Sequence, residues 1–206
     1  MSGKVKGVIT GNHFNKYESK NPLVKFVMGK YFGCIRYFLD RIKFDSLIDL
    51  GCGEGELIRW TSRYYRVSDI TACDIDSDLL AQIKFEFPKV KTKTLYLDKE
   101  TDTKNKYDLA IFLEVLEHIE DYEKALSNIS KMNMKYLLIS VPNEPFFRGA
   151  NLARFKYVKR LGNTPGHVNN FTYFKFRKLI KKYFPNDNIE FKVCYIWNFA
   201  FIRRRK

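Results

Sequence analysis

Cysteine is scarce in this sequence, and its positions are far apart. The four thiols, Cys34, Cys52, Cys73 and Cys194, form no C-x-x-C pair. This spacing argues against a disulfide framework and against a zinc site built from thiolates. We therefore expect buried free thiols.

Long apolar runs are also missing. One of the longest, YLLISV at residues 136–141, is far too short to cross a bilayer. The first ten residues, MSGKVKGVIT, contain no apolar stretch of signal-peptide length, so we expect a cytoplasmic protein. No internal repeat or low-complexity linker divides the 206 residues, a length that suits one domain.

Acidic residues are few at both ends of the chain. The net charge is +6 over residues 1–47, −4 over residues 48–141 and +12 over residues 142–206, which sums to +14. If the ends meet in the fold, they form a positive face for an anionic partner such as RNA or a membrane surface. The alternative is a lysine-rich surface that serves solubility alone.

Short apolar strands alternate with helices along the chain. A helix begins at Asn21-Pro22, another is capped by Ser77, a third by Asp121, and the last runs from Thr172 to about residue 183. Apolar segments predict strands at residues 46–51, 69–74, 92–97, 107–113 and 135–141, with a terminal antiparallel pair broken near Asn198. The alternation predicts an α/β fold, a parallel sheet with helices on both faces and a ligand site at the carboxyl ends of the strands.

The segment at residues 142–172 has weak periodicity and many polar and aromatic residues. A long irregular connection of this kind is typical of a functional loop, and we predict a substrate lid.

A glycine turn follows the first predicted core strand, in the string LIDLGCGEG. Its glycines are Gly51, Gly53 and Gly55, but Glu56 stands where a dinucleotide fingerprint requires a third glycine. Glu54 makes the turn acidic, which disfavours a pyrophosphate. An acidic turn suits a ligand that lacks phosphates and carries an ammonium and a sulfonium. S-adenosylmethionine is such a ligand.

Acidic residues also follow the next two strands. Asp74 ends the second strand, where its carboxylate can accept both ribose hydroxyls of a nucleoside. Asp98 follows the third strand and can accept from an adenine amino group, with Ile75 and Leu97 flanking the ring.

The strings LIDLGCGEG, ACDIDSDLL, LYLD and YDLAIFLEVLEHIED resemble the successive motifs of class I S-adenosylmethionine-dependent methyltransferases, over about residues 46–141. The resemblance implies a Rossmann-like, seven-stranded, mostly parallel sheet with a reversed terminal strand. It implies one methyltransferase domain over residues 1–206, with an N-terminal cap and helix (1–45), a cofactor-binding core (46–141), the lid (142–172), and a last helix and hairpin (173–206).

The same resemblance implies a set of residues for the S-adenosylmethionine site. Tyr17, in the string NKYESKNP, would close over the cofactor. The others are Asp49, Gly51, Cys52, Gly53, Asp74 and Asp98.

The string EVLEH offers a second site. On a short helix, Glu114, Glu117 and His118 would share one face, and His167 in the lid would return over it. Two carboxylates and imidazole suit Mg²⁺ or Mn²⁺. The grouping resembles the metal site of small-RNA terminal 2′-O-methyltransferases and an element of the ubiquinone-pathway O-methyltransferases. Without a metal, Glu114 borders the cofactor and His118 lines the substrate pocket.

Three functions fit this sequence. We expect O-methylation of a small, lipid-linked or otherwise anionic metabolite, with His118 or His167 as the base. The alternatives are an RNA 2′-O-methyltransferase and a non-catalytic S-adenosylmethionine-binding interaction protein. Possible substrate contacts are Asn143, Arg148 and Asn170, and His13 is a weaker candidate base.

Overall fold

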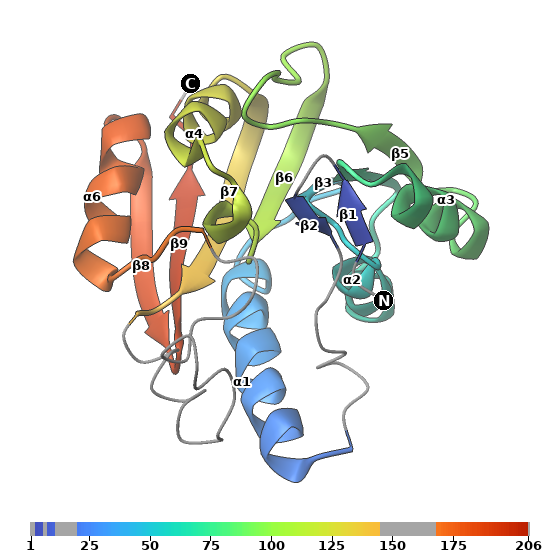
Figure 1. Cartoon of the computed structure of the whole chain (residues 1–206), viewed down its shortest axis with the longest axis horizontal. Helices are drawn as coiled ribbons and strands as arrows, with labels where there is room; N and C mark the ends of the chain where they lie inside the picture. Colours follow the sequence, from blue (N-terminus) through green and yellow to red (C-terminus); the bar gives the residue numbers. More distant parts are fainter. Residues whose placement is uncertain (1–2, 6–7, 11–19, 145–167, 206) are drawn as a thin grey trace.

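Seven strands form one twisted sheet in the computed structural model, which describes residues 3–5, 8–10, 20–144 and 168–205. The order across the sheet is β5-β4-β3-β6-β7-β9-β8 (Figure 1). Strands β3 to β7 pair in parallel, whereas β9 runs antiparallel to both β7 and β8. The predicted sheet with a reversed terminal strand is confirmed. The strands are β3 (Ser46–Leu50), β4 (Asp69–Asp74), β5 (Lys91–Thr94), β6 (Lys106–Leu113), β7 (Asn133–Pro142), β8 (Asn188–Cys194) and β9 (Trp197–Arg203).

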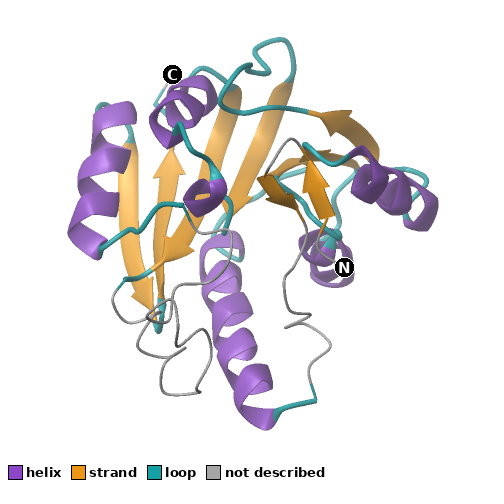
Figure 2. Cartoon of the chain, in the orientation of Figure 1, coloured by secondary structure: helices purple, strands orange, loops and turns teal. Residues whose placement is uncertain are grey.

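Helices cover both faces of this sheet (Figure 2). On one face pack α1 (Pro22–Leu39), α2 (Glu56–Tyr64) and α3 (Ser77–Glu86). On the other pack α4 (Tyr122–Ser130), α6 (Tyr173–Tyr183) and the short 3₁₀ helix η1 (Leu116–His118). A separate antiparallel pair, β1 (Gly3–Val5) and β2 (Val8–Thr10), was not predicted from the sequence. No helix in the described ranges is long and apolar enough to cross a membrane.

Polar side chains cap the helices, mostly where the sequence indicates. The side chains of Asn21, Asp121 and Thr172 each accept a backbone N–H from the first turn of the helix that follows. The cap predicted at Ser77 is wrong. Asp76 caps α3 by accepting two backbone N–H groups, and Ser77 is the first helical residue.

The terminal hairpin turns three residues earlier than the sequence suggested. Cys194 pairs with Trp197, so Tyr195 and Ile196 form the turn, and Tyr195 takes a left-handed backbone with φ of +56°. Asn198, which we expected to break the pair, lies inside β9 and is fully buried.

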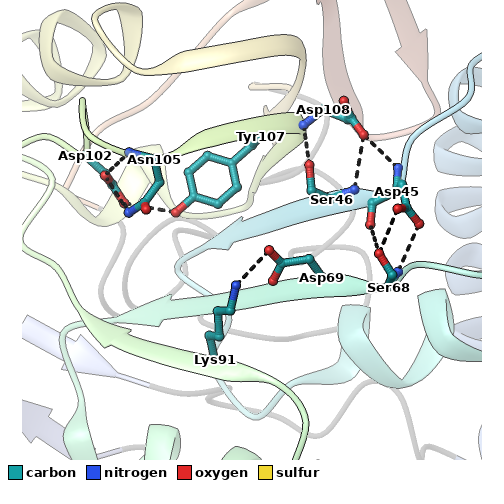
Figure 3. A network of polar contacts seen from close by, with 9 residues as sticks. All are labelled: Asp45, Ser46, Ser68, Asp69, Lys91, Asp102, Asn105, Tyr107 and Asp108. Carbon is teal, nitrogen blue, oxygen red and sulfur yellow. Dashed lines mark hydrogen bonds and ion pairs between the residues drawn. The ribbon is translucent and has the colours of Figure 1, made fainter.

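Polar contacts join the parallel strands at the edge of the sheet where these strands begin (Figure 3). Asp108 Oδ2 accepts the backbone N–H groups of Asp45 and Ser46 at 2.8 and 3.2 Å, and Ser46 Oγ accepts the backbone N–H of Asp108 at 2.8 Å. Lys91 pairs with Asp69 at 2.7 Å, which joins β5 to β4. These bonds anchor the amino-terminal edge of the sheet, opposite the predicted ligand site.

Candidate active site

The glycine turn after β3 adopts a conformation that favours glycine. Gly51, Gly53 and Gly55 all have positive φ, at +80°, +51° and +80°. The backbone N–H groups of Gly51 and Cys52 both donate to the carbonyl of Cys73, at 2.7 and 2.9 Å. These two hydrogen bonds hold the turn against the end of β4. Because the turn follows β3, it lies beside the point between β3 and β6 where the strand order reverses.

Gly51 also lies against the segment that follows β6. A Cβ atom added to Gly51 would lie 2.5 Å from Cγ2 and 2.8 Å from Cγ1 of Val115. A glycine is therefore required here for close approach as well as for backbone conformation. This contact places the predicted cofactor turn next to the EVLEH segment.

Asp74 and Gly53, both of which we predict to line the cofactor site, are joined by a hydrogen bond. Asp74 Oδ2 accepts the Gly53 N–H at 2.9 Å, and its Oδ1 accepts the Asp76 N–H at 3.1 Å. The carboxylate therefore holds the glycine turn in addition to the ribose contact that we predict. Burial raises its pKa, and the bonds from Gly53 and Asp76 oppose that rise.

Asp49 lies in β3, close enough to Asp74 to be affected by its charge, and is only 3% exposed. Among the described residues, no group hydrogen-bonds to its Oδ2. Burial, and secondarily the negative charge of Asp74, raises the pKa of Asp49 from 3.8 to about 7. A cationic ligand beside Asp49 would stabilise the ionised form, which fits the ammonium of an amino acid moiety better than a phosphate.

This raised pKa predicts a pH dependence for the stability of the ligand-free protein. The folded chain holds the Asp49 proton more tightly than the unfolded chain does. The free energy of unfolding should therefore fall as pH rises from about 4 to about 7. Asp49→Asn, which mimics the neutral form, should remove much of this fall. Urea unfolding at about pH 5 and about pH 8 would test it. A wild-type difference that the variant fully retains would exclude Asp49 as its source.

The predicted adenine contacts follow two neighbouring strands, with Ile75 directly after β4 and Leu97 and Asp98 beyond the end of β5. Strand β5 ends at Thr94, three residues earlier than predicted. Leu97 is buried, and its carbonyl accepts from Asn128 Nδ2 at 2.9 Å, so it packs towards α4. Asp98 and Ile75 are half-buried. Their contacts with adenine remain predictions.

Cys52 is buried beside the turn, and its contact with the cofactor also remains a prediction. Burial raises the pKa of its thiol, so the group is neutral. All four cysteines are free thiols, three of them buried and Cys194 half-buried.

The metal site predicted from EVLEH is not assembled as expected. Glu114 is not helical, because its φ of +60° places it in the left-handed region. Its Oε1 accepts the Ser140 hydroxyl at 3.0 Å and its Oε2 accepts Trp197 Nε1–H at 2.7 Å. Glu117 and His118 belong to η1. The described part of the chain contains no group of three or more His, Cys, Asp or Glu residues placed to hold a metal ion.

Instead, Glu114 belongs to a polar chain that sequence reasoning missed. The Tyr31 hydroxyl lies 3.2 Å from Ser140 Oγ, and the Tyr31 and Trp197 rings lie 4.6 Å apart between centroids. Helix α1 is thus joined to β7, β9 and the end of β6. No spacing in the sequence indicates this group, because its members come from four separate segments.

The two ends of the predicted lid converge near η1. The Glu117 carbonyl accepts the backbone N–H groups of Val168 and Asn169, at 3.0 and 3.1 Å. At the other end, the Glu144 N–H donates to the Phe171 carbonyl at 3.0 Å. Asn143 is buried and Asn170 is exposed. The remaining predicted residues, Tyr17, His13, Arg148 and His167, lie outside the described residues.

Comparison with known families agrees with this geometry. A family model described as a methyltransferase domain matches residues 25–183. The chain belongs to this methyltransferase family. The domain is of the class I, S-adenosylmethionine-dependent type, and the family implies S-adenosylmethionine as cofactor.

Individual relatives of this methyltransferase domain are distant. A putative methyltransferase, 235L, of Invertebrate iridescent virus 6 is 29% identical over 98 residues, which span 46% of this chain and 37% of that protein. The chain thus matches little more than a third of the length of that curated relative.

Solved structures share the fold at low identity. The small RNA methyltransferase HEN1 superposes with a TM-score of 0.70 at 19% identity, covering 96% of this chain and 27% of that one. The plantazolicin methyltransferase BamL also gives 0.70, at 11% identity, covering 93% and 89%. At these identities the likeness shows the fold alone.

Proposed function

We propose that the protein transfers the methyl group of S-adenosylmethionine to a hydroxyl oxygen of a small, lipid-linked or otherwise anionic acceptor. The observation that carries the proposal is the contact between Gly51 and Val115. This contact supports the proposal because it brings the cofactor turn next to the segment that bears His118, where a bound donor would lie near a candidate base.

In this proposal the protein promotes the reaction mainly by positioning the methyl donor and the acceptor. Asp74 binds the ribose and Asp49 faces the cationic part of the cofactor, which supplies an electrophilic methyl group when bound. His118, half-buried at the end of η1, would accept the proton of the acceptor hydroxyl. As the oxygen bonds to the methyl carbon, the bond from that carbon to sulfur would break, and its electron pair would stay on sulfur as the thioether leaves. Holding donor and acceptor in line accounts for most of the acceleration.

A metal ion takes no step in this mechanism. Both oxygens of Glu114 already accept protein hydrogen bonds, and η1 presents only Glu117 and His118 as further ligands. The donor set in the described residues therefore does not fit the metal site that the sequence suggested.

His118→Ala should lower kcat by about 10²- to 10⁴-fold, because a hydroxyl acceptor then loses its general base. Exhaustive chelation should leave activity unchanged, and Glu117→Gln, an isosteric change, should be mild. Transfer of labelled methyl groups to fractionated lipid, glycan, quinone-like and RNA extracts would identify an acceptor for these assays.

Two results would contradict this version. Loss of activity in chelator with recovery in Mg²⁺ or Mn²⁺, together with a Glu117→Gln variant as damaged as His118→Ala, would establish a metal-dependent enzyme. Full activity of His118→Ala across the pH range would exclude His118 as the base.

RNA 2′-O-methylation is the second candidate. It is supported by the net charge of +12 over residues 142–206 and by the shared fold of the small RNA methyltransferase HEN1. Labelled methyl groups recovered in RNA, with affinity that falls steeply as salt rises, would favour it over a small acceptor.

A further inference from the structure

Helix α1 begins with an unusual sequence for a surface helix. Residues 23–28 read LVKFVM, so its first turns are apolar on nearly every side. Val24 and Met28 face inward and are buried. Leu23 and Phe26, however, are 56% and 54% exposed. A helix that is apolar all round is usually covered on both sides.

The exposed side of α1 continues onto the β8–β9 turn. The Phe26 ring packs edge-on against Tyr195 at 6.1 Å between centroids, and Tyr195 is itself 52% exposed. We call Leu23, Phe26 and Tyr195 the rim patch. Figure 1 shows that this end of α1 extends past the edge of the sheet where the parallel strands end, on the same side as the β8–β9 turn.

Lys30 lies against the rim patch, and helix α1 contains no acidic residue. Lys30 Nζ lies 5.2 Å from the centroid of Phe26 and 5.8 Å from that of Tyr195. Residues 20–39 hold Lys20, Lys25, Lys30 and Arg36 with no Asp or Glu. Exposed apolar side chains with lysines around them are typical of segments that lie in the interface of an anionic bilayer.

Ring packing and a hydrogen bond connect the rim patch to the candidate active site. On α1, Tyr31 follows Phe26 by little more than one turn and packs on Trp197. Trp197 lies two residues beyond Tyr195 and donates to Glu114. A surface that holds the rim patch would therefore be connected through Trp197 to Glu114, in the segment that also bears His118.

We propose that the rim patch docks the protein on an anionic membrane surface and presents the site to an acceptor held in the lipid. The inference rests on the proposed function for its lipid-linked acceptor. Leu23 favours lipid over RNA, because an aliphatic side chain inserts between acyl chains but does not stack on bases.

Sedimentation with vesicles tests the proposal. The protein should bind vesicles of phosphatidylcholine mixed with phosphatidylglycerol, and bind pure phosphatidylcholine far less. Phe26→Gln and Tyr195→Asn should each lower partitioning about tenfold, because an inserted ring is lost. Lys30→Gln should lower it about fivefold. Asparagine is chosen because it tolerates the left-handed backbone of Tyr195.

Phe85→Gln is the matched control, since Phe85 is 90% exposed on α3, outside the rim patch. This control variant should bind vesicles as well as the wild type does. The circular dichroism spectrum and the affinity for S-adenosylmethionine should be the same as in the wild type for all four variants.

Three results would overturn the docking proposal. The first is that the wild type does not bind vesicles. The second is that Phe85→Gln lowers vesicle partitioning as much as Phe26→Gln does. The third is that the protein binds single-stranded polyuridylate, and Phe26→Gln abolishes that binding while vesicle binding persists. In each case intact cofactor binding would leave the proposed methyl transfer standing. Failure of the wild type to bind S-adenosylmethionine would instead remove the proposed function itself.

Discussion

Replacing Asp74 by alanine is expected to weaken S-adenosylmethionine binding by at least about 30-fold, or about 2 kcal/mol. The loss has two sources. The ribose hydroxyls would lose their acceptor, and the Gly53 N–H, which now donates to Asp74 Oδ2, would lose its partner. Isothermal titration calorimetry of the variant would measure the change.

Asp78→Asn provides the control for Asp74. Asp78 is exposed in the first turn of α3, four residues along the chain, and the substitution removes the same charge. Cofactor affinity should stay within about twofold of the wild type, as for an exposed charge. Equal affinities for Asp74→Ala and the wild type would show that the ribose is not bound at Asp74.

Gly51→Ala is expected to lower both cofactor affinity and the free energy of unfolding. A φ of +80° costs a residue with a Cβ atom on the order of 1 kcal/mol. Overpacking against Val115, at 2.5 Å from the new Cβ, adds about 1–3 kcal/mol. Chemical denaturation should show the loss, and the displaced turn should weaken cofactor binding by about tenfold or more.

Gly33→Ala is the matched control for Gly51→Ala. Gly33 lies in α1, and a Cβ atom added there would meet nothing within 4 Å, so alanine should stabilise the protein by about 0.5–1 kcal/mol. Adding Val115→Ala to Gly51→Ala should recover the stability lost through overpacking against Val115. It should not recover the stability lost through the positive φ of residue 51. A Gly51→Ala variant as stable as the wild type would refute the close contact.

Local signals in the sequence predicted most of the fold. Asn21, Asp121 and Thr172 cap helices because the first backbone N–H groups of a helix lack partners within it, and a short polar side chain just before the helix can accept from them. The prediction failed where neighbouring residues offer the same chemistry. Asp76 and Ser77 can both cap a helix, and only the backbone conformation decides between them.

The hairpin shows a different limit. Asn198 looks like a turn residue, yet the pairing of Cys194 with Trp197 fixes the turn at Tyr195. Register is set by all the pairs of a hairpin together, so one polar residue cannot determine it.

The candidate site also has one part that local sequence signals indicate and another that they do not. The meeting of the glycine turn with Asp74 was predictable because the ends of neighbouring parallel strands lie at one edge of a sheet, whereas Asp49, inside β3, was indicated only by the family resemblance. The chain from Tyr31 through Ser140 to Glu114 was not, since it depends on tertiary packing between distant segments. The metal hypothesis assumed a helix at Glu114, but the backbone there is left-handed, and its fourth residue, His167, lies outside the described residues.

The most direct test of the central claim is a calorimetric titration of the wild-type protein with S-adenosylmethionine. The glycine turn is acidic, Glu56 occupies the position where a dinucleotide fingerprint has its third glycine, and Asp49 is buried nearby. We therefore expect one saturable S-adenosylmethionine site per chain. S-adenosylhomocysteine should compete for that site and NAD should not. Absence of saturable binding, or displacement by NAD, would contradict the account.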